Sequence, residues 1–169
     1  MPEITLRHDF ATDEDTYWAK CVFDADFNRK LYIEGLKFPV WKLLDSKDDD
    51  ERLWRRVQVD PPVGNLPGPV KKVIGDKLSY VEEGTYDRTT HKYTFKVVPS
   101  TMADKTKVAG EMWCEKAGDK KITRFTKISV EVKVFMVGGM VEERILSDLR
   151  SSYEKGSDFT NEYIKQNGL

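Results

Sequence analysis

The stretch KVFMVGGMVEERILSDLRSSYEKGSDFTNEYI, residues 133–164, decides the fold of this chain. A strand-like run breaks at two adjacent glycines, and a long amphipathic helix is predicted to follow over residues 140–166. Ser152 and Gly156 interrupt the apolar stripe of this helix, where a helix that only closes a core would carry leucine. These small residues indicate that the helix covers something besides protein.

Most of the chain before this stretch alternates between apolar and polar residues with a period of two, which is typical of β-strands. A first strand is predicted over residues 3–10. Because each strand has one apolar and one polar face, we expect an antiparallel sheet with one face in water. Six further strands are predicted at about 38–46, 51–60, 78–87, 92–99, 105–117 and 122–135.

Two short helices are predicted between the first and second strands. Thr12 is the expected N-cap of the first helix, because Asp15 follows three residues later as in a capping box. The second helix is expected over residues 24–36, with Gly35 as its C-terminal stop. The predicted order is therefore strand, two helices, six strands and one long helix, and only the last helix is long enough to cover the apolar face of the sheet.

Length and composition favour a single domain over residues 1–169. A net charge of −1 argues against a dedicated nucleic-acid-binding protein, which usually shows a basic excess. No apolar run is long enough to span a membrane, and the N-terminus lacks a signal-peptide pattern, so we expect a cytoplasmic protein. Reduced thiols are expected for Cys21 and Cys114, with a disulfide left open.

Four segments of the chain resemble a bacterial START-like domain family of unknown function. They are FNRKLY, VKKVIGDKLSYVEEGTYDR, FKVVPSTMADK and EVKVFMVGGMVEERILSDLRSSYEKGSDFTNEYI, and the similarity extends over nearly the whole chain. The resemblance and the element order imply the α+β helix-grip fold of the START-like (SRPBCC) superfamily. In this fold a curved antiparallel sheet of about seven strands wraps around a long C-terminal helix, in the order β-α-α-β6-α.

The same resemblance implies a hydrophobic cavity between the sheet and the C-terminal helix, which such domains use for lipids, sterols or polyketides. We therefore expect binding or transport of a hydrophobic small molecule, with a lipid as the leading candidate. An alternative is an enzyme of the polyketide cyclase/dehydratase kind that uses the same cavity. A third possibility is an interaction domain whose side chains fill the cavity, with Ser152 and Gly156 packed against Tyr80, Tyr93 or Phe95.

Catalytic motifs are scarce in the sequence, which favours binding over catalysis. It contains no Gly-x-Ser-x-Gly elbow, no His-Glu-x-x-His, no Cys-x-x-Cys and no phosphate-binding loop. His8 and His91 are isolated, so we expect neither a metal site nor a cofactor.

Arg55 is the most informative charged residue, because alternation places it on the same face as Leu53 and Val57. A guanidinium buried there must be paired, with Glu82 or with a carboxylate or phosphate of a ligand, whereas a rim position would leave it in water. The predicted ligand-binding residues line the two sides of the cavity: Arg55, Val57, Val59, Tyr80, Tyr93, Phe95, Val97, Val108, Met112, Ile128, Val130, Val132, Ile145, Leu149, Ser152, Tyr153 and Gly156.

The longest irregular connection, residues 60–77, is rich in proline and glycine and contains a short amphipathic turn. It is expected to act either as a gate at the mouth of the cavity or as a packed connector. As a gate, its Lys71 and Lys72 would permit transient contact with an anionic membrane surface.

Overall fold

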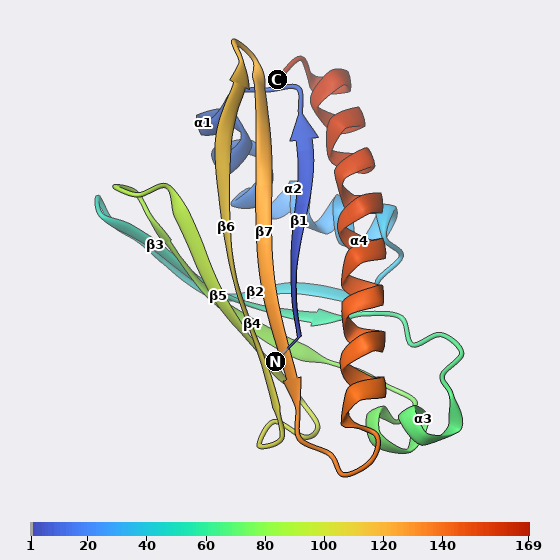
Figure 1. The fold of residues 1–169 in the computed structure, drawn as a ribbon. Coiled ribbons are helices and arrows are strands. Elements are labelled where there is room, and N and C mark those ends of the chain that lie inside the picture. Colours follow the sequence, from blue (N-terminus) through green and yellow to red (C-terminus); the bar gives the residue numbers. More distant parts are fainter. Residues whose placement is uncertain (1) are drawn as a thin grey trace.

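The computed structural model describes residues 2–169 and shows an α+β fold, with one antiparallel sheet and a long C-terminal helix beside it (Figure 1). The sheet has seven strands in the spatial order β1-β7-β6-β5-β4-β3-β2. The strands are β1 (Glu3–Phe10), β2 (Val40–Asp48), β3 (Arg52–Asp60), β4 (Tyr80–Asp87), β5 (Lys92–Pro99), β6 (Thr106–Gly118) and β7 (Lys121–Val132). The predicted fold class and the number of strands are confirmed.

The two N-terminal helices are short, and each continues into a π-helical turn. They are α1 (Glu14–Tyr17) with η1 (Trp18–Val22), and α2 (Ala25–Arg29) with η2 (Lys30–Gly35). The prediction that Thr12 caps the first helix is wrong. Asp13 is the N-cap, because its carboxylate accepts hydrogen bonds from both the backbone N–H and the hydroxyl of Thr16.

The connection between β7 and the last helix differs from the prediction. The strand ends at Val132, three residues early, and α4 (Gly138–Asn167) begins at the first glycine of the pair. The tight turn uses Met136, whose φ is 66°, and neither glycine has a positive φ. Gly138 is required for another reason: a Cβ there would lie 2.3 Å from the backbone oxygen of Val132.

Two glycines allow aromatic rings to lie across the inner face of the sheet. Gly84 of β4 and Gly110 of β6 both pair in register with Phe95 of β5. A Cβ at Gly84 would lie 2.1 Å from the hydroxyl oxygen of Tyr93, and one at Gly110 would lie 2.5 Å from the ring of Phe95. The glycine at 110 is therefore needed for packing.

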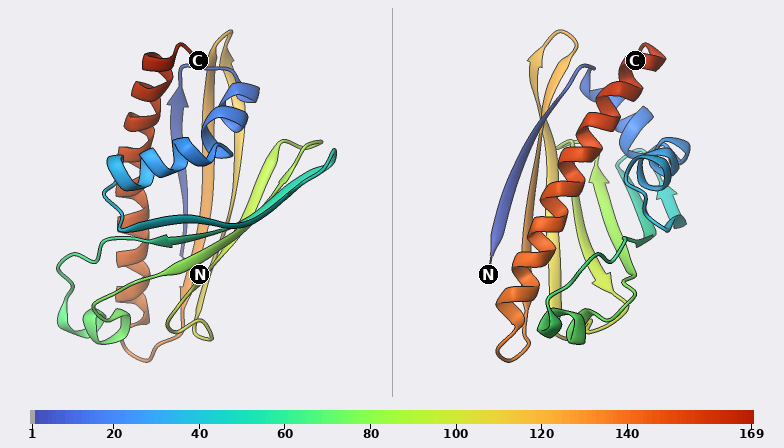
Figure 2. Two further views of the ribbon diagram at one scale, coloured as in Figure 1. Left: turned by 180° about the vertical axis from the view of Figure 1, so that it is seen from behind. Right: turned by 90° about the vertical axis from the view of Figure 1, so that its right-hand side faces the viewer.

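Helix α4 runs along one side of the sheet, next to β1 and β7, while β2–β5 turn away from it (Figures 1 and 2). It packs against β1, β7 and η2, but among residues 2–169 its contacts with β3, β4 and β5 are sparse. No helix in the described chain is long and apolar enough to cross a bilayer. Helix α3 (Gly68–Ile74) packs through Val70 at the end where α4 begins.

Candidate functional site

The interior of the fold lies between α4 and the inner face of strands β3–β5, and several side chains there are not fully buried. On β4 and α4, Tyr80, Glu82 and Leu149 point toward this interior yet remain partly exposed. Glu82 pairs in register with Val57 and Val97, so its carboxylate lies in an otherwise apolar row. The inner face of the sheet thus carries a carboxylate among apolar neighbours.

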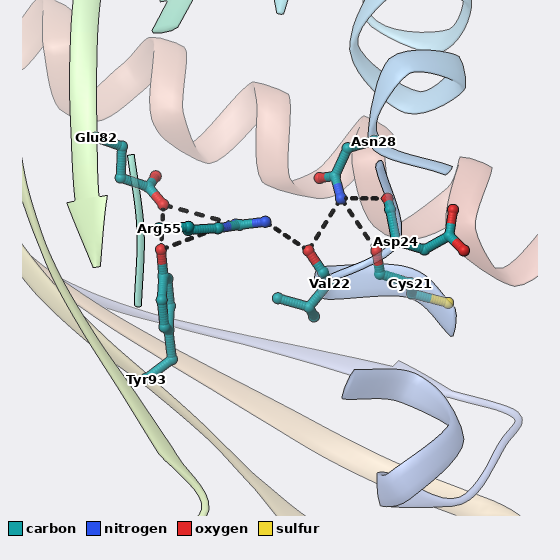
Figure 3. Close-up of polar contacts among 7 residues, drawn as sticks. All are labelled: Cys21, Val22, Asp24, Asn28, Arg55, Glu82 and Tyr93. Atoms are coloured by element: carbon teal, nitrogen blue, oxygen red, sulfur yellow. Dashed lines mark hydrogen bonds and ion pairs between the residues drawn. The ribbon is translucent and has the colours of Figure 1, made fainter. Parts of the chain in front are cut away.

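Arg55, Glu82 and Tyr93 form a polar cluster on the inner face of the sheet (Figure 3). The Tyr93 hydroxyl donates to Oε1 of Glu82 at 2.7 Å and accepts from Nε of Arg55 at 3.2 Å. Nη2 of Arg55 lies 3.7 Å from the same carboxylate oxygen. The predicted pairing of Arg55 with Glu82 is confirmed, and Gly84 provides the room through which the Tyr93 side chain reaches both residues.

The same arginine joins the sheet to the N-terminal helices. Its Nη1 donates to the backbone oxygen of Val22 at 2.7 Å, and its guanidinium carbon lies 5.3 Å from the ring centroid of Phe23. Asn28 fixes this segment, because its Nδ2 donates to three backbone oxygens, including that of Val22 at 2.9 Å (Figure 3). Arg55 is therefore held from both sides.

One oxygen of Glu82 remains available. Oε1 takes the contacts with Tyr93 and Arg55, whereas Oε2 forms no hydrogen bond or ion pair with any residue from 2 to 169. The side chain is 17% exposed although it lies on the inner face. Burial is the main cause that raises the pKa of Tyr93, and Glu82 raises it further, so this hydroxyl keeps its proton and donates.

Three tyrosines add hydroxyl groups to the walls: Tyr32 from η2, Tyr80 from β4 and Tyr153 from α4. Burial raises the pKa of all three, to about 12 for Tyr32, and their proximity to Glu82 contributes in each case. None of the three hydroxyls forms a hydrogen bond within the described part of the chain. These are free polar groups on otherwise apolar walls.

A second buried arginine, Arg124 of β7, lies on the same face of the sheet. Its Nη1 donates to the hydroxyl of Tyr17 at 2.8 Å, and its Nη2 lies 3.1 Å from Nδ1 of His8. Burial and then the charge of Arg124 lower the pKa of His8, so Nδ1 is free to accept this hydrogen bond. Sequence reasoning missed Arg124, although its alternation with Ile122 and Thr126 contained the signal.

A separate pocket of about 190 Å³ opens between the N-terminal helices and strands β2 and β3. Arg55 lines it, so this side chain separates the pocket from the interior. The full lining is Phe23, Ala25, Asn28, Trp41, Leu43, Ser46, Asp48, Leu53 and Arg55. A larger, open groove of about 500 Å³ lies at the C-terminal end of α4, and none of the predicted site residues borders it.

The predicted ligand-binding residues divide into two groups by exposure. Gly156 is buried under η2. A Cβ added at Gly156 would lie 3.6 Å from the side chain of Leu31, so Gly156 packs against this leucine of η2. The other buried members are Val57, Val59, Tyr93, Phe95, Val108, Met112, Ile128, Val130 and Val132. The partly exposed members are Arg55, Tyr80, Val97, Ile145, Leu149, Ser152 and Tyr153.

The remaining sequence predictions concern side chains outside this interior. Both cysteines are free, as expected, and burial raises the pKa of each thiol to about 12. His91 lies in the β4–β5 hairpin, 3.7 Å from a carboxylate oxygen of Glu14.

Solved structures with the same fold include two enzymes and a START protein. The aromatase/cyclase Zhui from Streptomyces sp. R1128 has a TM-score of 0.70 at 7% identity, over 99% of this chain and 96% of that one. A START superfamily protein from Mycobacterium smegmatis has a TM-score of 0.62 at 14% identity, with 97% of both chains covered. Norcoclaurine synthase from Thalictrum flavum has a TM-score of 0.63 at 14% identity, over 95% and 87%.

No curated protein matches this chain. At the identities of the solved structures, likeness shows the fold alone, which confirms the START/SRPBCC helix-grip architecture. The model of a family described as "Protein of unknown function (DUF2505)" matches residues 5–164. The chain therefore belongs to the DUF2505 family and has the helix-grip fold of START-like proteins.

Proposed function

We propose that this protein binds an apolar small molecule, with a lipid as the leading candidate, between α4 and strands β3–β5. The observation that carries the proposal is the partial exposure of inward-facing side chains on α4 and β4, such as Leu149 and Tyr80. Interiors are normally close-packed, so a fold that leaves such residues uncovered has room for a ligand. Apolar burial would supply most of the affinity, at about 25 cal/mol per Å².

Filling the interior with a larger side chain tests this proposal. Ser152 is half-buried and is expected to face the interior, whereas its neighbour Ser151 is exposed. We expect Ser152→Phe to weaken the binding of the neutral dye Nile red by about tenfold or more, because the larger side chain would occupy the space of the dye. A tenfold change corresponds to about 1.4 kcal/mol of binding free energy. Ser151→Phe is the matched control and should bind like the wild type. Equal binding by the two variants would place the dye elsewhere and contradict the proposal.

A second candidate function, dehydration or cyclisation of a polyketide-like substrate, is favoured by the free oxygen of Glu82. Tyr93 and Arg55 hold the other oxygen, so the carboxylate is oriented and able to accept a proton. In a β-hydroxyketone, Glu82 would remove the proton next to the carbonyl. The bond between the β-carbon and its hydroxyl oxygen then breaks. The departing hydroxide takes the proton from Glu82 and leaves as water.

One variant distinguishes this enzymatic candidate from simple binding. Glu82→Gln should abolish formation of the enone from a long-chain β-hydroxyketone, followed by ultraviolet absorbance, and should leave Nile red binding unchanged. Tyr32→Phe, which alters a hydroxyl without a hydrogen-bond partner in the described chain, should keep full activity. If the wild type forms no enone, the enzymatic candidate is wrong and the binding proposal stands.

Transient contact with a membrane surface would let the protein collect or deliver its ligand. Phe135 and Met136, in the loop before α4, are 90% and 84% exposed. This loop and α3 lie at the same end of the molecule (Figures 1 and 2). Lys71 is already paired with Asp76 at 3.3 Å, so the two apolar side chains, rather than the lysines of α3, would dominate the contact.

A further inference from the structure

Arg124 is an interior cation without an anionic partner. Its residue exposure is 7%, and among residues 2–169 no carboxylate lies within salt-bridge distance of its guanidinium. Arg55, the other interior arginine, has Glu82. We propose that the interior ligand carries a carboxylate at one end and that this carboxylate pairs with Arg124. The inference rests on the proposed binding function and names the chemical class of the ligand.

The groups that surround Arg124 are neutral. Tyr17 and His8 contact its nitrogens, and the rings of Phe10 and Tyr153 lie 4.9 and 5.2 Å from its guanidinium carbon. Burial raises the pKa of Tyr17 to about 12, so this phenol stays protonated at neutral pH. Neutral contacts lessen the cost of burying the guanidinium without balancing its charge.

The nearest acidic side chains do not supply the missing charge. Glu154 and Asp158 on α4, and Asp9 on β1, lie close enough to His8 to offset part of the lowering of its pKa. None of the three forms an ion pair with Arg124 within the described residues. Asp9 instead accepts a hydrogen bond from Thr123 at 2.7 Å. The positive charge of Arg124 therefore remains available to a ligand.

Unused hydrogen-bonding groups mark the same place. Nε of Arg124 and Oγ1 of Thr126 are both buried and lack a partner within residues 2–169. The two residues are two positions apart on β7, so their side chains share one face with Cα atoms about 7 Å apart. Buried polar groups are nearly always paired, and a carboxylate that entered between them, with a shift of the Tyr153 ring that lies over Arg124, would satisfy both.

The position of Arg124 also sets the orientation of the ligand. The ring of Tyr153 lies over Arg124, and Tyr153 is a partly exposed residue of α4. A carboxylate at Arg124 would leave the apolar part of the ligand to extend between α4 and strands β4 and β5. A carboxylate fits better than a phosphate monoester, because its single charge matches one arginine whereas the phosphate carries about −1.5 to −2.

Dodecanoate and dodecanol, two probes with the same chain and different heads, test the inference by displacement of Nile red at neutral pH. We expect the wild type to bind dodecanoate about ten to a hundred times more tightly than dodecanol, as charge-assisted hydrogen bonds are worth about 1.5–3 kcal/mol. Arg124→Met should lose this preference and keep its affinity for dodecanol. Arg7→Met, on the outer face of β1, is the matched control and should keep the preference.

Thr126→Val provides a second variant that retains the charge. It should weaken dodecanoate binding several-fold and leave dodecanol binding unchanged, even if Arg124→Met fails to fold. Equal wild-type affinities for the two probes would overturn the inference and leave the binding function intact, whereas failure of both probes to bind would overturn both. Tighter binding of dodecyl phosphate than of dodecanoate would overturn the assignment to a carboxylate.

Discussion

Tyr93 illustrates how single residues shape the interior. Its hydroxyl connects Arg55 and Glu82, and it reaches them only because position 84 is a glycine. The alternation of Tyr93, Phe95 and Val97 predicted that Tyr93 points inward. The contact with Glu82 depends on the register of β4 against β5, which a single sequence does not determine.

Removing this hydroxyl should destabilise the protein. Tyr93→Phe leaves the buried groups of Arg55 and Glu82 without their shared partner, so we expect a loss of about 1–3 kcal/mol in the free energy of unfolding. Tyr32→Phe, whose hydroxyl has no hydrogen-bond partner in the described chain, should change it by less than about 0.5 kcal/mol. Urea denaturation measures both, and equal effects of the two substitutions would refute the structural role of the cluster.

His8 should make stability depend on pH. Burial, and next the charge of Arg124, lower its pKa below the value of 6.5 found in an unfolded chain. The unfolded state therefore takes up the proton first. The contribution of His8 is fully present above pH 6.5 and is lost as the pH falls from there through the pKa of the folded state.

The comparison with His8→Gln isolates this effect. The free energy of unfolding of the wild type should fall more steeply between about pH 6.5 and pH 5 than that of the variant. Curves that run parallel through this window would show that His8 is not held neutral by its surroundings.

The sequence predicted the existence of each strand better than the residues at which the strands end or the way in which they connect to the helices. Period-two alternation located all seven strands, because most of them bury one face; β2 is the exception, since it is exposed from Lys42 onward. The π-helical turn η2 does not follow the usual helical period, so sequence reasoning missed that Tyr32 points into the interior. Arg124 was missed, although the strand predicted over residues 122–135 places it on the same face as Ile122 and Ile128.

The joint between β7 and α4 depends on one glycine of the pair. Gly138→Ala should destabilise the protein by about 1–3 kcal/mol, because the new Cβ would overlap the backbone oxygen of Val132. Gly139→Ala meets nothing within 4 Å and should be neutral or stabilising by up to about 1 kcal/mol. Thermal unfolding of the two variants measures the difference, and equal melting temperatures would contradict this account of the joint.

The loop before α4 lies at one end of the whole molecule (Figure 1). It carries two exposed apolar side chains, those of Phe135 and Met136. Replacing Phe135 and Met136 together by serine should reduce binding to vesicles of phosphatidylcholine and phosphatidylglycerol by more than tenfold, since each side chain contributes about 1.5–3 kcal/mol when buried. The melting temperature should not change, because both side chains are in water.

Val98→Ser is the control for that experiment, as Val98 is 46% exposed on strand β5. It should leave vesicle binding, measured by co-sedimentation, unchanged. Membrane contact is not part of the function if the wild type does not sediment with vesicles, or if the double variant sediments equally well.

An apolar ligand bound between α4 and the sheet would remain with the protein through purification. Native mass spectrometry of the purified protein, followed by organic extraction and identification of the released molecule, tests for such a ligand most directly. We expect one apolar molecule per chain, a long-chain carboxylic acid, that is absent from Ser152→Phe and retained by Ser151→Phe. A protein that carries no such molecule and takes none up when mixed with long-chain acids or alcohols would contradict the account.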